Sequence, residues 1–135
     1  MFHFRLEPGS GVPPYLQLVH QVRQAVRLGF LLPGDRLPLI REVVEELAIN
    51  PNTVAKAYRQ LEQEALVTGR PGQGTFVNDA APTAMAPAVY GSLRRGLETW
   101  LRRAYAAGLD EQSVQALFAA VHHQTSADRV QKEAA

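Results

Sequence analysis

The 135-residue sequence contains no cysteine. Neither disulfide bonds nor a thiolate zinc site can therefore stabilise it, which fits an intracellular compartment. No apolar run approaches the roughly 20 residues that span a membrane, and the first residues lack the basic and then apolar pattern of a secretory signal. These absences lead us to expect a cytoplasmic protein.

The sequence also lacks an excess of charge of either sign, since its formal net charge is +1. Residues 1–80 contain eight Lys or Arg and eight Asp or Glu, so total charge gives this region no reason to bind nucleic acid. The distribution is uneven, however, because Lys56 and Arg59 have no acidic neighbour between Asn50 and Gln60. We expect modest non-specific affinity for DNA with a shallow salt dependence.

Two short amphipathic segments occupy the middle of the chain, with a tight turn between them. Asn50 can cap a following helix through its side-chain oxygen, and Pro51 suits the first helical position. The pattern predicts a helix-turn-helix whose second helix starts near Pro51 and enters the major groove of DNA. The apolar residues follow the i, i+3, i+4, i+7 spacing of a helix with one buried face, at Ile40, Val43, Val44 and Leu47 and then at Val54, Ala57, Tyr58 and Leu61.

Two β-prone runs follow the second helix. Residues 66–68 and 75–77 flank the Gly/Pro-rich turn 69–74, which predicts a hairpin and therefore a winged helix. An earlier helix is predicted from Pro14 to Gly29. Residues 1–11 either add a strand or cover the domain.

The region after residue 77 changes in composition. Residues 78–90 are rich in Ala and Pro and predict a linker, and two apolar stripes then predict two helices of about four turns each within 91–125. Two helices bury too little surface to be stable alone, so a second copy of the chain is the simplest partner. The expected dimer contacts are Leu93, Leu97, Trp100, Leu101, Leu117 and Phe118. The polar tail 126–135 is predicted to fray.

Several short motifs between Pro13 and Val77 occur in the order and at the spacing of a known family. They are Pro14-Tyr15, Leu32-Pro33-Gly34-Asp35-Arg36-Leu37-Pro38, Arg41-Glu42, Asn50-Pro51-Asn52-Thr53-Val54, Ala57-Tyr58-Arg59-Gln60-Leu61-Glu62 and Gly72-Gln73-Gly74-Thr75-Phe76-Val77. The region resembles the DNA-binding domain of GntR-type bacterial transcriptional regulators. The short C-terminal region resembles the YtrA-like branch, whose members lack a large effector domain and often lie beside genes for transport systems.

The resemblance implies an α+β, mostly helical fold, with a winged helix-turn-helix in residues 1–77 and a two-helix C-terminal dimerisation tail. It also implies a sequence-specific DNA-binding transcriptional regulator, a repressor, that binds a palindromic operator of double-stranded DNA as a homodimer. The alternative is a winged-helix protein-interaction module without sequence-specific DNA binding.

The resemblance places DNA contact at the start of the first helix of the pair, on the leading end of the second helix and on the wing. Arg41 could instead be a solvated helix arginine, and Asn50 could act only as a cap. Pro51 and Ala55, where some relatives carry arginine, cannot hydrogen-bond a guanine edge. The candidate residues are Arg41, Asn50, Asn52, Thr53, Lys56, Arg70, Gln73, Gly74 and Thr75.

Other chemistry finds little support in the sequence, and we expect neither an enzyme nor a metal or other cofactor. Adjacent histidines such as His122 and His123 point about 100° apart on a helix and do not chelate together. Residues 72–74 lack the strand before and helix after them that a phosphate loop needs. A small-molecule effector of unknown identity would bind in a cleft shared by two subunits or beside the linker. Trp100, Tyr105 and Phe118 would line the shared cleft, or these residues only hold the dimer together.

Overall fold

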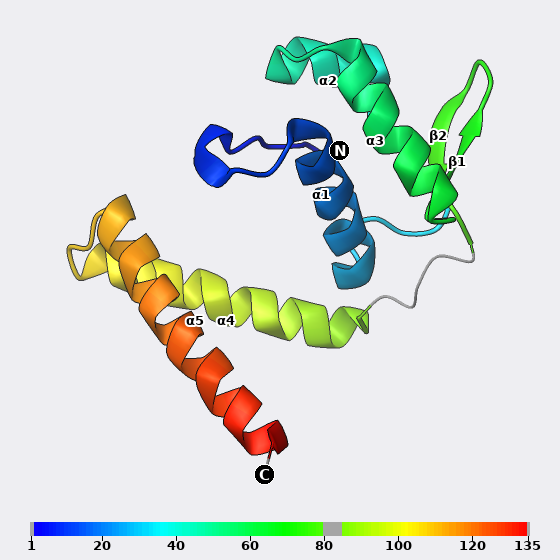
Figure 1. Ribbon diagram of the computed structural model, residues 1–135. Helices are drawn as coiled ribbons and strands as arrows, with labels where there is room; N and C mark the ends of the chain where they lie inside the picture. The colour runs from blue at the N-terminus through cyan, green and yellow to red at the C-terminus, as the bar shows by residue number, and fades with distance from the viewer. Residues whose placement is uncertain (1, 80–84, 135) are drawn as a thin grey trace. The chain divides into compact units, whose positions relative to one another are not determined.

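The computed structural model describes residues 2–79 and 85–134, and the chain divides into two compact units, Met1–Tyr90 and Gly91–Ala135 (Figure 1). The first unit contains α1 (Pro14–Leu28), α2 (Ile40–Leu47), α3 (Pro51–Gln63), β1 (Val67–Arg70) and β2 (Gly74–Val77), preceded by a 3-10 turn at Pro8–Ser10. This order confirms the predicted winged helix-turn-helix and its mostly helical α+β class.

The core of the first unit lies between α1 and α3. Tyr58 and Leu61 of α3 are buried, as the helical spacing predicts. The spacing is wrong for Ile40, the first residue of α2, which is exposed. The largest fully buried side chains are Leu18, Leu37, Leu61, Val19, Val22, Val43, Val54 and Val67.

The turn between α2 and α3 is fixed by local hydrogen bonds. Ala48 ends α2 in the left-handed conformation, with φ 54° and ψ 46°. The backbone N–H of Asn52 donates to Asn50 Oδ1 at 2.8 Å, so Asn50 caps α3 and Pro51 begins it, as predicted.

Tyr58 joins α3 to the segment before α2. Its hydroxyl donates to the backbone oxygen of Pro38 at 2.6 Å in a buried position. Burial, with a smaller contribution from the charge of Glu42, raises the pKa of the Tyr58 hydroxyl. The Glu42 carboxylate accepts the N–H of Leu39 at 3.0 Å and so caps the first turn of α2.

The wing has three backbone segments. β1 pairs antiparallel with β2, with Val67 opposite Val77 and Arg70 opposite Gly74. The other edge of β2 pairs with the segment at Arg36, where the Leu37 N–H donates to the Thr75 oxygen at 2.8 Å. The tip is therefore Pro71–Gln73, shorter than the predicted turn 69–74, because the ladder extends to Arg70 and Gly74.

Residues 2–7 form no strand and instead cover the core, which decides between the two possibilities for this segment. Phe4 is buried, and its ring lies edge-on to Phe2 with centroids 5.0 Å apart. The side chain of Gln21 on α1 accepts from the Arg5 N–H at 2.9 Å and donates to the Arg5 carbonyl. This pair of hydrogen bonds holds residues 2–7, the N-terminal arm, along α1.

The C-terminal helices are longer than predicted: α4 spans Pro87–Ala106 and α5 spans Glu111–Ala134 (Figure 1). The predicted linker therefore ends before Pro87, whose missing N–H costs nothing in a first turn, and residues 80–84 lie outside the described residues. α5 includes residues 126–134, most of the tail predicted to fray; Ala, Gln and Lys favour helix there, and Arg129 lies 3.8 Å from Glu133 one turn later. No helix in the described ranges is long and apolar enough to cross a membrane.

Candidate nucleic-acid interface

The leading end of α3 exposes polar side chains. Asn50, Asn52 and Lys56 are exposed and Thr53 is half-buried, whereas Val54 on the opposite face is fully buried. The N-terminal backbone N–H groups of a helix, together with short polar side chains, suit phosphate oxygens and base edges alike. The burial pattern of α3 thus leaves its predicted reading surface accessible.

Lys56 makes a contact that the sequence analysis missed. Its Nζ lies 3.9 Å from the centroid of the Tyr15 ring, in the first turn of α1. At an exposed site such a cation–π contact contributes roughly 0.5–1 kcal/mol. The Pro14-Tyr15 motif in the sequence marks the start of a helix but does not indicate that Tyr15 contacts Lys56. Tyr15 therefore restricts where the Lys56 ammonium can lie.

A hollow of about 710 Å³ separates the wing from the start of α2. It brings together the predicted residues Arg41, Arg70, Gln73, Gly74 and Thr75. The α3 candidates do not line it. Its other lining residues are Arg36, Leu39, Gly69, Pro71 and Gly72.

Guanidinium groups give this hollow its charge. Arg36, Arg41 and Arg70 come from three different segments, and none of the described residues that line the hollow is acidic. Arg70 lies with its guanidinium carbon 4.6 Å from the centroid of the Phe76 ring, its diagonal neighbour across the strands. Arg36 is not among the predicted site residues, although its position next to buried Leu37 could have indicated an outward side chain.

Three acidic residues of the first unit, Glu42, Glu46 and Glu64, have partners of their own and do not line this hollow. The Glu64 carboxylate accepts two hydrogen bonds of 2.7 Å from Arg23. These bonds hold the pKa of Glu64 below its usual value and raise the pKa of Arg23. Glu46 lies 3.1 Å from His3 Nδ1, and Glu42 caps α2.

Comparison with known proteins identifies the family. Residues 14–77 match the family model described as bacterial regulatory proteins, gntR family. Over 106 residues the chain is 32% identical to the HTH-type transcriptional repressor YtrA of Bacillus subtilis (strain 168), and the match covers 78% of this chain and 82% of that protein. The chain belongs to the GntR family. The YtrA-like resemblance seen in the sequence is confirmed.

Two solved structures agree with this fold. YtrA from Sulfolobus acidocaldarius, a GntR-family transcription factor, superposes with a TM-score of 0.54 at 26% identity, over 91% of this chain and 99% of that one. The DNA-binding domain of AraR, in complex with operator ORX1, superposes with a TM-score of 0.51 at 26% identity, over 57% of this chain and 99% of that one.

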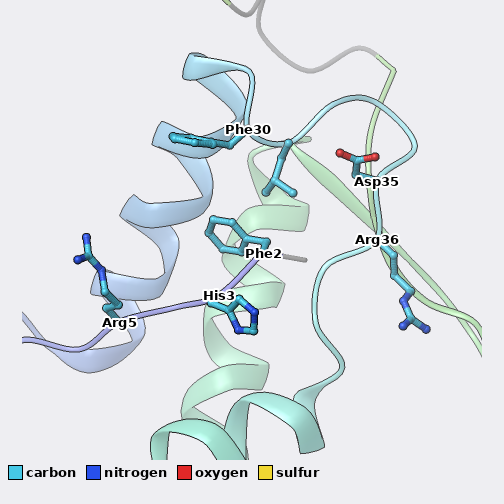
Figure 2. Close-up of a pocket in the computed structure, with 7 residues that line it drawn as sticks. Phe2, His3, Arg5, Phe30, Asp35 and Arg36 are labelled. Atoms are coloured by element: carbon cyan, nitrogen blue, oxygen red, sulfur yellow. The ribbon is translucent and has the colours of Figure 1, made fainter. Parts of the chain in front are cut away.

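A second hollow, of about 650 Å³, contains none of the predicted site residues (Figure 2). It lies between the N-terminal arm and the segment after α1. Its lining residues are Phe2, His3, Arg5, Phe30, Leu31, Asp35 and Arg36. Among the described residues, no three His, Cys, Asp or Glu side chains gather in a way that could hold a metal ion.

The predicted dimer residues lie on α4 and α5 of the second unit. Trp100 and Leu101 are half-buried within a single chain. Ala104 and Val114 are the buried apolar residues of these helices. The remaining predicted residues are exposed: Leu93 59%, Leu97 47%, Leu117 41% and Phe118 50%.

Proposed function

We propose that this GntR-family chain is a sequence-specific DNA-binding transcriptional regulator, a repressor, that binds a palindromic operator as a homodimer in the cytoplasm. The observation that carries the proposal is the arginine-lined hollow beside the wing, on the same unit as the exposed polar end of α3. A concave surface with three arginines and, among the described residues that line it, no acidic side chain favours a polyanion.

Base readout is assigned to α3 and Arg41. Asn52 is exposed in the first turn of α3, where its amide can form two hydrogen bonds with an adenine edge. Arg41 offers the guanidinium fork that pairs with guanine, and Thr53 and Lys56 complete the reading surface. Asn50 keeps its amide nitrogen for DNA, because only its oxygen is used by the cap.

Backbone contact is assigned to the wing. Gly74 has a φ of 126°, a conformation that side-chain-bearing residues rarely adopt, and Gly72 at the tip has a φ of 75°. These glycines allow the tip to approach a sugar–phosphate chain closely. Arg70, Gln73 and Thr75 then supply donors to phosphate oxygens.

The homodimer is supported by the apolar surface of α4 and α5. Monomeric proteins seldom leave large apolar side chains exposed in contiguous patches, and Leu93 and Leu97 follow one another at one helical turn. A second copy would cover these side chains and present two reading heads to two half-sites. A small-molecule effector would bind in the cleft shared by the two copies, beside Trp100, Tyr105 and Phe118.

The test uses a labelled duplex of the DNA upstream of the chain's own gene and an unrelated duplex of equal length. The full chain is expected to bind the first more tightly, at a stoichiometry of two chains per duplex by sedimentation. Arg41→Ala should cost roughly 1–3 kcal/mol of specific binding. Arg27→Ala removes the same charge from an exposed position in the last turn of α1 and serves as the control.

Equal affinity for both duplexes would instead support non-specific binding. No binding to either duplex, with an intact circular dichroism spectrum, would favour the winged-helix protein-interaction module. The repressor assignment has its own measurement, since a reporter gene behind the upstream DNA should be expressed more strongly when the chain is absent.

A further inference from the structure

Arg36 lines the hollow beside the wing but is not among the residues to which the family resemblance assigned DNA contact. We propose that Arg36 is a further DNA-binding residue, which holds a phosphate of the sugar–phosphate backbone against the wing. The proposal rests on the proposed function, because it names an additional contact within the same interface.

The backbone of Arg36 is part of the wing. Arg36 forms a β-bridge with Phe76, and backbone hydrogen bonds of the two neighbouring residues hold Arg36 in register with β2. The N–H of Leu37 donates to the Thr75 oxygen at 2.8 Å, and the N–H of Val77 donates to the Asp35 oxygen at 2.8 Å. Arg36 is therefore positioned by the same β2 strand that positions the predicted contacts Gly74 and Thr75.

The side chain of Arg36 packs against Gly74. A Cβ atom added at Gly74 would lie 3.2 Å from Arg36 Cδ and 3.4 Å from Cγ, so the aliphatic stem packs across the place that a side chain would occupy. Figure 2 shows the Arg36 side chain directed away from Phe2 and Asp35 of the other hollow. The guanidinium is thus available to the hollow that it shares with Arg41 and Arg70.

No residue in the ranges 2–79 and 85–134 forms an ion pair with Arg36. Its neighbour Asp35 uses a carboxylate oxygen to accept the Leu32 N–H at 2.9 Å. A guanidinium keeps its charge at any physiological pH and fits two phosphate oxygens with parallel N–H donors. A ligand rich in phosphate would therefore meet an unengaged, correctly charged group.

A phosphate is a better partner for Arg36 than a base edge. Arg36 extends from a sheet edge beside the glycine-rich wing, where close approach to the backbone is possible, and not from the helix that enters the major groove. Contacts to phosphates are independent of sequence, whereas contacts to base edges discriminate between sequences. This difference can be measured.

The experiment compares the full chain with Arg36→Gln, which keeps the stem that packs on Gly74 and removes the charge. Affinity for the upstream duplex and for an unrelated duplex of equal length is measured over a series of salt concentrations. We expect Arg36→Gln to weaken binding to both duplexes by the same factor and to lower the salt slope by about 1. Arg36→Lys should keep the slope, and Arg27→Gln should change neither quantity.

The outcomes separate this inference from the proposed function. If the unchanged chain binds neither duplex, the proposed function fails, and the Arg36 inference fails with it. If the unchanged chain binds and Arg36→Gln matches it in affinity and salt slope, Arg36 does not contact DNA. A loss confined to the upstream duplex would assign Arg36 to a base edge and overturn the phosphate contact. Arg36→Met, which also keeps an aliphatic stem, replaces Arg36→Gln if that variant fails to fold.

Discussion

Replacing Ala48 by glycine should stabilise the protein, although glycine usually weakens it. Ala48 lies in the turn between α2 and α3 with φ 54° and ψ 46°, a left-handed conformation in which its Cβ crowds the backbone. This conformation costs roughly 1–2 kcal/mol for a residue with a side chain. Glycine adopts it without that cost and is the usual residue at such a helix end.

The expected gain is smaller than the strain relieved. Glycine also gives the unfolded chain more freedom, which costs about 0.4–1 kcal/mol. The difference leaves a net stabilisation of about 0.5–1 kcal/mol, or a rise of roughly 2–5 °C in the midpoint of thermal unfolding for a chain of this size. Because the backbone angles do not change, the N–H of residue 48 should still donate to the Val44 oxygen, and DNA affinity should stay the same.

Urea unfolding followed by circular dichroism measures this change. The unfolding free energy should depend on urea concentration with the same slope in both proteins, which shows that the same transition is being compared. The matched control is Ala55→Gly in the interior of α3, where the same replacement should destabilise by about 1 kcal/mol. Ala65, with φ 60°, offers a second left-handed site for which a gain is expected. Equal destabilisation at residues 48 and 55 would show that the turn is not strained, and the reasoning would be refuted.

Three further predictions concern the cap, an ion pair and assembly. Asn50→Ala should lower stability by about 1 kcal/mol and also weaken operator binding, whereas Asn50→Ser should restore the cap and the stability but not the affinity. If Asn50→Ser recovers both the stability in urea unfolding and the operator affinity in fluorescence anisotropy, Asn50 acts only as a cap. The lowered pKa of Glu64 means that its ion pair with Arg23 stabilises the fold above the usual carboxyl pKa, and that this contribution is lost as the pH falls through the lowered value of the folded state. Because both side chains are partly exposed, Glu64→Gln should cost less than about 1 kcal/mol near neutral pH and should flatten the acid side of the stability profile; an unchanged profile would mean that the pair contributes nothing. Removing residues 91–135 should leave a folded, monomeric winged helix with weaker binding to palindromic DNA, and a dimer in sedimentation would place the interface in the first unit.

Local signals predicted most of the first unit. The side-chain oxygen of Asn50 and the fixed φ of Pro51 act within one turn, so the start of α3 could be predicted from neighbouring residues. Apolar spacing likewise predicted the buried face of α3. The same logic failed at Pro87, because a proline in a first turn and a proline in a linker look alike until the helix that follows is known.

The candidate interface was predicted only in part. Arg41 and the wing residues carried motif signals, and the structure brings them to one hollow. The Pro14-Tyr15 motif did not indicate that Tyr15 would contact Lys56, because the two residues lie far apart in the chain. Arg36 was likewise missed because its role depends on pairing with Phe76 in a later segment.

By itself the sequence determined the order and type of the elements of the first unit, because caps, turn residues and apolar periodicity act over a few neighbouring residues. Only the tertiary structure decided which charged side chains form ion pairs with one another. Glu64 is paired with Arg23 of another helix, whereas no residue in the described ranges forms an ion pair with Arg36 beside Gly74 of the wing. Electrostatic interactions depend on distance through space, and the fold sets that distance by bringing together residues that lie far apart in the chain.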